Sequence, residues 1–344
     1  MNLAEKLIAQ QTLTKEEFIH LLDHYQDADT VKLLTDEAVK IRRRYYGNKV
    51  YTRGLIEFTN YCKNNCYYCG IRKGNHHAAR YRLTKEEILS CCENGYRLDF
   101  RTFVLQGGED PWYTEERMLD IIHSIKSAYP DCALTLSIGE KSYDSYKRFR
   151  EAGADRYLLR HETASEAHYQ TLHPENMSLA VRKQCLYDLK SLGYQVGAGF
   201  MVGSPGQTHA ELAEDLLFLK ELSPEMAGIG PFIPHHDTPY ANEKAGSIEM
   251  TLFLLSVIRI MLPKILLPAT TALGTLDPHG REKGLSVGAN VVMPNLSPLN
   301  HRKQYELYDN KICTQEEAAE SRASLAAQVR AIGYELVKER GDAI

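Results

Sequence analysis

Three cysteines stand close together in the segment EFTNYCKNNCYYCGIR, directly after a predicted strand. Cys62, Cys66 and Cys69 follow a C-x3-C-x2-C pattern. Three thiolates on one short loop can bind three irons of a 4Fe-4S cluster and leave the fourth iron without a protein ligand. Because catalytic metal sites keep an open coordination position, this pattern predicts a cluster that takes part in a reaction.

Other uses of cysteine fit the sequence less well. A structural zinc site usually has two ligand pairs, and no second Cys-x2-Cys or His-x3-His follows at a useful spacing. A disulfide framework is not expected in a chain of 344 residues without a secretory signal. The remaining cysteines have no partner spacing, and we interpret them as buried thiols: Cys91, Cys92, Cys132, Cys185 and Cys313.

Two charged residues at the end of a predicted strand are a second candidate for chemistry. In RYLLRHETA, Arg160 and Glu162 alternate around His161, so the two charges point to the same side of the strand. A charged pair that faces into a protein is costly unless each charge finds a partner. A functional role is therefore favoured over the alternative, a buried ion pair that ties two strands together.

Two further groups have open interpretations. His235 and His236 with Asp237 could suggest a second metal, but adjacent residues project differently and no third ligand has a suitable spacing. Tyr305 and Tyr308 lie one helical turn apart, which fits either simple packing or two phenols that lean over a substrate.

The elements that position these residues are predicted to form a barrel. Short apolar runs alternate with amphipathic segments, an order typical of a (β/α)8 barrel of the TIM type. The last pair of strands is less regular, so we expect an imperfect closing unit. The predicted strands are Gly54–Thr59, Thr102–Leu105, Leu134–Ile138, Arg156–Leu159, Val196–Val202, Gly228–Ile233, Leu266–Thr271 and Asn290–Met293.

Helical extensions are expected on both sides of this barrel. Residues 1–50 contain a capping box at Thr14 and Glu17, followed by an apolar face. Residues 51–312 form the predicted barrel. Residues 313–344 are expected to pack on it with a helix from Thr314 to Val337, and the whole chain is predicted to be one domain.

The barrel prediction also says where chemistry takes place. In such barrels the active site forms at the carboxyl ends of the strands. The cysteines, Gln106–Glu109, Ser137–Glu140 and Arg160–Thr163 all follow predicted strands. The fifth strand ends in glycines that either form turns or let a flat ring approach the backbone: Gly197, Gly199, Gly203 and Gly206.

Bulk properties exclude several classes of protein. The formal net charge of −4 argues against nucleic acid or an anionic membrane as the main partner. The longest apolar run, LFLLSVIRIML, is shorter than a membrane span and is interrupted by Arg259, so we expect a buried helix. Without a signal peptide pattern, and with an air-sensitive cluster, we expect a cytoplasmic location.

The cysteine spacing resembles that of the radical S-adenosylmethionine (SAM) superfamily. Tyr68 matches the aromatic residue before the last cysteine of that pattern. The run LQGGED resembles the Gly-Gly-Glu element that lies against the methionine end of SAM, which implies SAM contacts at Gly107, Gly108 and Glu109. The end of the fifth strand is similar to the superfamily's adenine-contacting strand.

Over nearly its whole length the chain resembles the [FeFe]-hydrogenase maturase HydE family. The matching blocks include YCKNNCYYCGIR, VLQGGEDP, GADRYLLRHETA, GYQVGAGFMVGSPGQT and GANVVMPNLSP. The resemblance implies SAM contacts at Thr135, Ser137, Glu162, Arg182 and Met201. For Arg182 alone, a surface arginine is an equal alternative. The resemblance also implies a substrate cavity lined by Arg160, Thr270, Thr271, Met293, Tyr305 and Tyr308.

Two positions depart from the family pattern. Some members carry a second, peripheral cluster whose cysteines begin at the position matching Cys313, but no further cysteine follows it here. We therefore predict no second cluster. Some members have serine at the position of Gly107, which leaves the substrate contact there undefined.

The family resemblance implies a reaction and its partners. A low-potential donor of the ferredoxin or flavodoxin class would reduce the cluster, and SAM would be cleaved to methionine and a 5′-deoxyadenosyl radical. The implied substrate is small and anionic, an iron–cysteine species that carries CO and cyanide. The implied role is assembly of the diiron subcluster and its dithiolate bridge in hydrogenase H-cluster maturation, alongside companion maturases.

Three other functions stay open at this point. Methylornithine synthase, which rearranges lysine, is a related radical enzyme. Biotin synthase needs ligands for a second cluster inside the barrel, and the remaining cysteines give no such set. A non-catalytic iron–sulfur carrier would not need SAM, and the glycine-rich end of the fifth strand argues against it.

Overall fold

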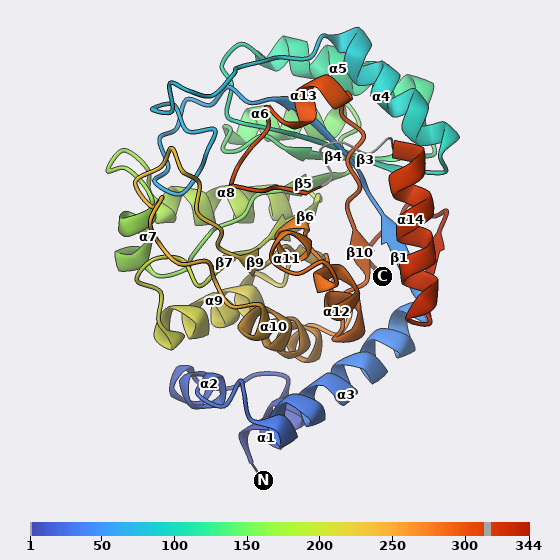
Figure 1. Ribbon diagram of the computed structural model, residues 1–344. Helices are drawn as coiled ribbons and strands as arrows, with labels where there is room; N and C mark the ends of the chain where they lie inside the picture. Colours follow the sequence, from blue (N-terminus) through green and yellow to red (C-terminus); the bar gives the residue numbers. More distant parts are fainter. Residues whose placement is uncertain (1, 313–317) are drawn as a thin grey trace.

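The N-terminal part of the chain forms three helices that pack on the outside of the barrel (Figure 1). The computed structural model describes residues 2–312 and 318–344. The predicted capping box is present, because Thr14 Oγ accepts the amide hydrogen of Glu17 at 3.3 Å and the Glu17 carboxylate accepts that of Thr14 at 3.1 Å. The helices are α1 (Leu3–Gln10), α2 (Lys15–Leu22), which contacts α9 (His209–Leu222), and α3 (Ala28–Tyr46), which contacts α10 (Ile248–Met261).

The predicted (β/α)8 barrel is confirmed. Six strands form one parallel sheet in the order β2-β3-β4-β5-β6-β8, with the bounds β2 (Gly54–Thr59), β3 (Thr102–Gly107), β4 (Ala133–Ser137), β5 (Arg156–Leu158), β6 (Gln195–Ala198) and β8 (Met226–Ala227). Isolated parallel bridges continue the ring through the last two units and close it: Met226–Leu266, Pro268–Val291 and Leu55–Asn295. The closing unit, which we expected to be imperfect, is therefore held by single bridges where continuous strand pairing would otherwise complete the ring.

Helices surround this ring, and α11 (Thr271–Leu276) is drawn inside it (Figure 1). They are α4 (Lys85–Arg97), α5 (Glu115–Ala128), α6 (Tyr143–Glu151), α7 (Glu166–Leu172), α8 (Leu179–Ser191), α9 (His209–Leu222), α10 (Ile248–Met261), α11 (Thr271–Leu276), α12 (Gly280–Ser286) and α13 (Leu299–Arg302). The short strand β10 (Val291–Val292) belongs to the closing unit.

Two predicted strands are interrupted. The expected strand Val196–Val202 is divided into β6 and β7 (Met201–Val202), because Gly199 between them has a φ of 146°. A Cβ atom at Gly199 would lie 2.0 Å from the Gly228 carbonyl oxygen, so only glycine allows this close approach. The expected strand Gly228–Ile233 is likewise replaced by β8 and β9 (Gly230–Pro231), and β9 pairs with β7.

The prediction of one C-terminal helix up to Val337 is wrong. Helix α14 (Ala318–Ala331) ends before Gly333, whose φ of 82° is a left-handed conformation that terminates helices. The chain then forms β11 (Glu335–Val337), which pairs in parallel with β1 (Lys49–Thr52). Residues 313–317, which include Thr314 and Cys313, lie outside the described residues.

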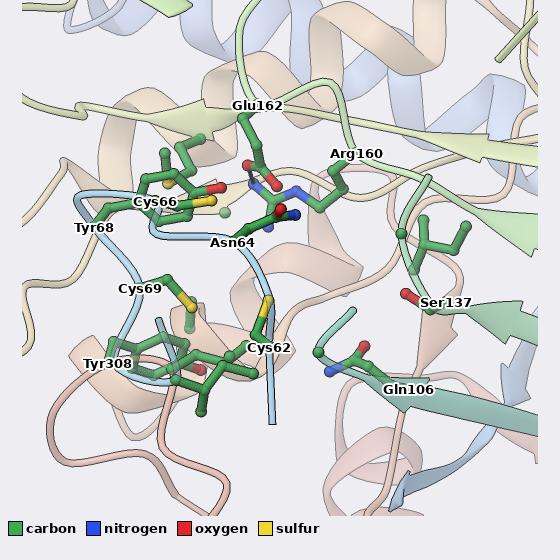
Figure 2. Close-up of a pocket in the computed structure, with 18 of the residues that line it drawn as sticks. Cys62, Asn64, Cys66, Tyr68, Cys69, Gln106, Ser137, Arg160, Glu162 and Tyr308 are labelled. Carbon is green, nitrogen blue, oxygen red and sulfur yellow. Dashed lines mark ion pairs between the residues drawn. The ribbon is translucent and has the colours of Figure 1, made fainter. Parts of the chain in front are cut away.

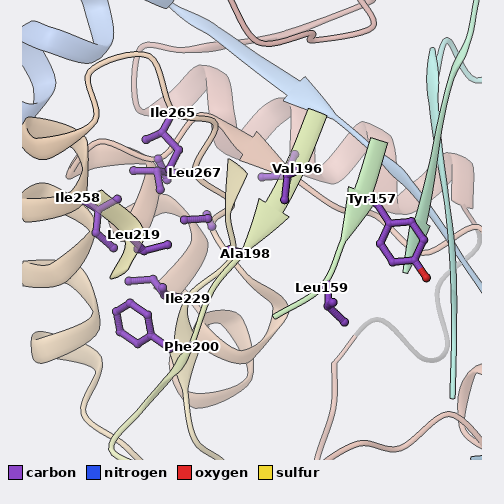
Figure 3. Close-up of a cluster of buried hydrophobic side chains, with 14 of the residues drawn as sticks. Tyr157, Leu159, Val196, Ala198, Phe200, Leu219, Ile229, Ile258, Ile265 and Leu267 are labelled. Atoms are coloured by element: carbon purple, nitrogen blue, oxygen red, sulfur yellow. The ribbon is translucent and has the colours of Figure 1, made fainter. Parts of the chain in front are cut away.

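One large apolar core connects the parts of the chain. It contains Leu7 and Leu21 from the N-terminal helices, the side chains of the barrel strands that face the surrounding helices, and Val329 from α14. Figure 3 shows a section of it, in which Val196 and Ala198 of β6 lie near Leu219 and Ile258 from the surrounding helices. Burying each such large side chain contributes about 1.5–3 kcal/mol. The predicted boundaries of the barrel at residues 50 and 312 stay predictions, because one apolar core continues across both and does not mark where a region ends.

The apolar segment around Arg259 is a buried helix, as predicted. Arg259 in α10 is fully buried, and its guanidinium donates to the carbonyl oxygens of Gly288 at 3.1 Å and Ile265 at 2.6 Å. Within the described ranges, no helix combines the length and the apolarity that a bilayer crossing requires.

Candidate active site

The three cysteines lie on a long loop that leaves the carboxyl end of β2 and returns at Arg82. The loop is closed at its base by an antiparallel bridge between Thr59 and Arg82. Cys62, Cys66 and Cys69 all line one pocket at the barrel mouth, where Figure 2 shows them facing Arg160, Glu162 and Ser137. The loop and the ends of β3, β4 and β5 thus meet at the edge where the barrel architecture predicts chemistry.

The environment of the thiols fits a metal cluster. Burial raises the pKa of all three thiols, to about 12 for Cys69, and the charges of the neighbouring cysteines raise the pKa of Cys66 and Cys69 further. Three thiols that oppose each other's ionisation need a cation as compensation. An iron–sulfur cluster supplies it, because a coordinating thiol is deprotonated by the metal.

The Gly-Gly-Glu run at the end of β3 packs against the cysteine loop. A Cβ atom at Gly108 would lie 2.2 Å from the Tyr61 carbonyl oxygen and 2.8 Å from Cys62 Cβ, so the loop can approach this strand only at glycine. The Glu109 carbonyl accepts the amide hydrogen of Lys63 at 2.9 Å. This run therefore places the first cysteine. At Gly107, a side chain would meet the Thr59 methyl group at 2.7 Å.

Arg160 and Glu162 form an incomplete pair at the end of β5. Arg160 Nη2 lies 3.1 Å from Glu162 Oε2, yet the geometry makes no hydrogen bond. Among the described residues, both atoms and Arg160 Nε have no hydrogen-bond partner although they are buried. Polar atoms that are buried and lack a partner are costly, so the pair is suited to a charged ligand that contacts both groups.

Arg182 reaches the same pocket from α8. It is buried, so the alternative of a surface arginine is wrong. Its Nε donates to Glu140 Oε1 at 2.5 Å and its Nη1 donates to the Arg160 carbonyl oxygen at 2.9 Å. These contacts fix a positive charge beside the incomplete pair.

Most of the predicted site residues line this pocket. They are the three cysteines with Tyr68, Gly107, Gly108, Glu109, Ser137, Glu162, Arg182 and Met201 from the cofactor set, and Arg160, Thr270, Tyr305 and Tyr308 from the substrate set. Three predicted residues do not line it. Thr271 begins α11, and Met293 packs near Val291 and Leu266.

Thr135 is the third residue outside the pocket. Its side chain lines a separate, small interior cavity with Arg53 and Arg156. Thr135 precedes Ser137 by two positions on β4, so both side chains point to the barrel interior, and Thr135 lies deeper along the barrel axis. Its assignment as a SAM contact stays a prediction.

Gln106 and Asn64 also line the pocket, although neither was among the predicted site residues. Gln106 is the last polar residue before Gly107 on β3 and points into the pocket (Figure 2). It forms a side-chain hydrogen bond with Tyr305, while burial raises the pKa of the Tyr305 phenol. The sequence did indicate a position near the site for Gln106, because this residue belongs to the polar group that follows the predicted strand Thr102–Leu105. Asn64 carried no signal beyond its place between two cysteines.

The histidine pair near the mouth has a third neighbour that the sequence did not reveal. Asp309 Oδ1 lies 2.7 Å from His236 Nδ1 and 4.0 Å from His235 Nε2. However, His235 Nδ1 accepts the amide hydrogen of Asp237 at 3.1 Å, which leaves the ring proton on Nε2, where a metal would need a lone pair. We interpret this group as a hydrogen-bonded contact between two segments at the barrel mouth, residues 235–237 after β9 and residues 305–309.

A parallel barrel with three cysteines on the loop after its first strand defines a radical SAM enzyme. The sequence model of the radical SAM superfamily matches residues 56–219. The chain is 51% identical to the [FeFe] hydrogenase maturase subunit HydE of Thermotoga maritima over 80% of this chain and 78% of that protein. The chain therefore belongs to the HydE family.

More distant relatives share the same architecture. The chain is 30% identical to the 3-methylornithine synthase of Methanosarcina barkeri over 90% of this chain and 87% of that protein. It also resembles the crystal structure of methylornithine synthase (PylB), with a TM-score of 0.84, 27% identity and 97% coverage of both chains.

Proposed function

We propose that this enzyme acts in the maturation of [FeFe] hydrogenase, in assembly of the diiron subcluster and its dithiolate bridge. The 51% identity to the T. maritima maturase carries the proposal. The proposed companions are the other hydrogenase maturases and a low-potential ferredoxin or flavodoxin, in a reducing cytoplasm.

The proposed cofactors are one 4Fe-4S cluster on Cys62, Cys66 and Cys69, and SAM. When bound, they supply one-electron cleavage of the bond between sulfur and C5′ of SAM. The absence of a second cluster stays a prediction, because Cys313 is not among the described residues.

The residues around the thiols have distinct proposed roles. Glu162 offers the ammonium or ribose of SAM a buried carboxylate oxygen that has no hydrogen-bond partner among the described residues, and Arg182 offers a positive charge to the carboxylate of SAM. The other proposed SAM contacts are Tyr68, Gly107, Gly108, Glu109, Thr135, Ser137 and Met201.

The substrate is proposed to lie on the other side of SAM. Arg160 has two buried guanidinium nitrogens without a hydrogen-bond partner in the described ranges, which suit a small anionic, thiol-derived ligand, such as an iron–cysteine species with CO and cyanide. Thr270 Oγ is likewise buried without a partner among the described residues. The other proposed contacts are Thr271, Met293, Tyr305 and Tyr308. Holding the reactants in place is worth about 7–11 kcal/mol in favourable cases.

In-vitro activation of an apo [FeFe] hydrogenase tests this proposal. Mixtures of the companion maturases with and without the anaerobically reconstituted protein would be assayed for hydrogen evolution. We expect hydrogenase activity only when the protein is present. Equal activity in both mixtures would refute the maturation role.

The likeness to methylornithine synthase, in sequence and in fold, supports a second candidate function. Incubation of the reconstituted protein with lysine, SAM and dithionite would form methylornithine if that function were correct. We expect no methylornithine, because the identity to the hydrogenase maturase is much higher.

A further inference from the structure

Arg80 lies at the base of the cysteine loop and contacts both of its ends. The guanidinium donates to the Asn60 carbonyl oxygen, two residues before Cys62. It also donates to the Ile71 carbonyl oxygen at 2.8 Å, two residues after Cys69. One side chain therefore joins the segment that enters the cysteine loop to the segment that leaves it.

The second nitrogen of the same guanidinium extends this connection. Nη2 donates to the carbonyl oxygens of Arg72 at 2.6 Å and Asn75 at 2.9 Å. Asn60 completes the base, since its side-chain amide donates to the Ala79 carbonyl at 2.8 Å and accepts the Tyr81 amide hydrogen at 2.8 Å. A loop without regular secondary structure is thus held by a planar fork with several donors, which lysine cannot reproduce.

Among the described residues, no carboxylate neutralises the charge of Arg80. In the part of the chain that the structure describes, all four of its hydrogen bonds go to carbonyl oxygens and none to an acidic side chain. The charge interacts with the thiol groups of Cys62 and Cys69, and the side chain is half-buried, where solvent screens it incompletely. The neighbouring Arg82 differs, because Asp110 pairs with it at 2.6 Å.

We propose that Arg80 is a positioning residue of the cluster site, which holds the cysteine loop closed and sets an unneutralised positive charge beside the cluster. The inference rests on the proposed cluster at Cys62, Cys66 and Cys69. A nearby positive charge stabilises the reduced cluster, which carries one more electron than the oxidised form. Arg80 therefore raises the midpoint potential, since charge and hydrogen bonds around a cluster set that potential.

Redox titration of the reconstituted protein tests this role. The potential would be measured without SAM, with dithionite as the reductant and the EPR signal of the reduced cluster as the readout, together with iron and sulfide content. Arg80→Gln removes the charge, and Arg80→Lys keeps the charge but not the fork. Lys73→Gln is the control, because it removes an exposed charge from the same loop.

The variants give distinct expected results. Arg80→Gln shifts the midpoint potential to more negative values, Arg80→Lys shifts it less, and Lys73→Gln leaves it unchanged. A parental potential in Arg80→Gln would overturn the inference. If Arg80→Gln retains no cluster, retention in Arg80→Lys supports the role of the charge, and loss in both variants but not in Lys73→Gln supports the role of the fork in holding the loop. Equal loss in Lys73→Gln would overturn the inference. Failure of the unsubstituted protein to bind a cluster would instead refute the proposed function.

Discussion

Glu162 has a backbone conformation that residues other than glycine rarely adopt, with a φ of 66°. Two hydrogen bonds hold it there, from its own amide to the Gly199 carbonyl and from the Met201 amide to its carbonyl, both at 3.1 Å. Such strain is found at functional sites, where the surrounding structure compensates for it. In this conformation, the carboxylate of Glu162 faces the pocket beside the three thiols.

Replacing Glu162 by glutamine should weaken SAM binding. The substitution keeps the size of the side chain but removes its charge, and hydrogen bonds to charged groups contribute about 1.5–3 kcal/mol, or roughly tenfold or more in affinity. Equilibrium SAM binding to the reconstituted protein would show this loss with unchanged iron content. Glu166→Gln is the control, because Glu166 is exposed on the neighbouring helix. Parental SAM affinity in Glu162→Gln would exclude this residue from the cofactor site.

At the scale of elements, two mouth segments are joined by a titratable contact. His236 follows β9, and Asp309 lies in the segment that carries Tyr305 and Tyr308. Asp309 accepts hydrogen bonds from the His236 amide at 3.0 Å and from its Nδ1 at 2.7 Å. The hydrogen bond to Asp309 raises the pKa of the His236 imidazole, and the charges of Asp309, Asp237 and Glu306 add to this effect.

The contact between these segments should weaken as the pH rises. Because the folded-state pKa of His236 lies above the unfolded value of about 6.5, its stabilising contribution is complete below that pH and is lost above the folded-state pKa. Hydrogen exchange of peptides covering residues 305–309, corrected for intrinsic rates, should show protection that falls as the pH rises above about 6.5. His236→Gln should remove this dependence, and an equal dependence in that variant would contradict the assignment.

At the scale of the whole molecule, the C-terminal segment closes the end of the barrel opposite the mouth. Arg156 of β5 is buried and donates to Asp342 Oδ1 at 2.6 Å and to the Arg340 carbonyl oxygen at 2.9 Å. Burial alone would raise the pKa of the Asp342 carboxyl, but the charge of Arg156 and hydrogen bonds from both arginines outweigh it and lower that pKa to about 2.

Asp342→Asn should therefore destabilise the protein at neutral pH. We expect a loss of about 1 kcal/mol in the free energy of unfolding, a small value because Asp342 is partly exposed. The depressed pKa makes this contribution present above about pH 4 and lost as the pH falls towards 2. Urea denaturation at several pH values would measure it. Glu339→Gln, which breaks an exposed pair with Lys49, should have almost no effect. Equal stability of Asp342→Asn and the parent at pH 7 would contradict the role of this ion pair.

The sequence predicted the features that depend on local pattern. The alternation of apolar and amphipathic segments predicted the barrel, and the spacing of Cys62, Cys66 and Cys69 predicted the loop that lines its mouth. The strand β11 was missed because three residues after a helix carry almost no periodic signal.

Features that depend on contacts between distant segments could not be predicted. Arg80 is one charged residue in a polar loop, and its four carbonyl partners become visible only when the loop is folded. Asp309 lies 73 residues from His236 in sequence. Thr135 and Ser137 share one face of a strand. Only the shape of the barrel places Ser137 in the pocket and Thr135 in the small cavity below it.

Three thiols at the barrel mouth are proposed to hold a cluster that cleaves SAM. The most direct test is quantification of 5′-deoxyadenosine after anaerobic incubation of the reconstituted protein with SAM and dithionite. We expect 5′-deoxyadenosine together with methionine for the unsubstituted protein and for Cys132→Ala, whose thiol is buried away from the pocket. We expect neither product above background for Cys66→Ala. Equal product formation by Cys66→Ala, or none by the unsubstituted protein with a full cluster, would exclude this role of the three thiols.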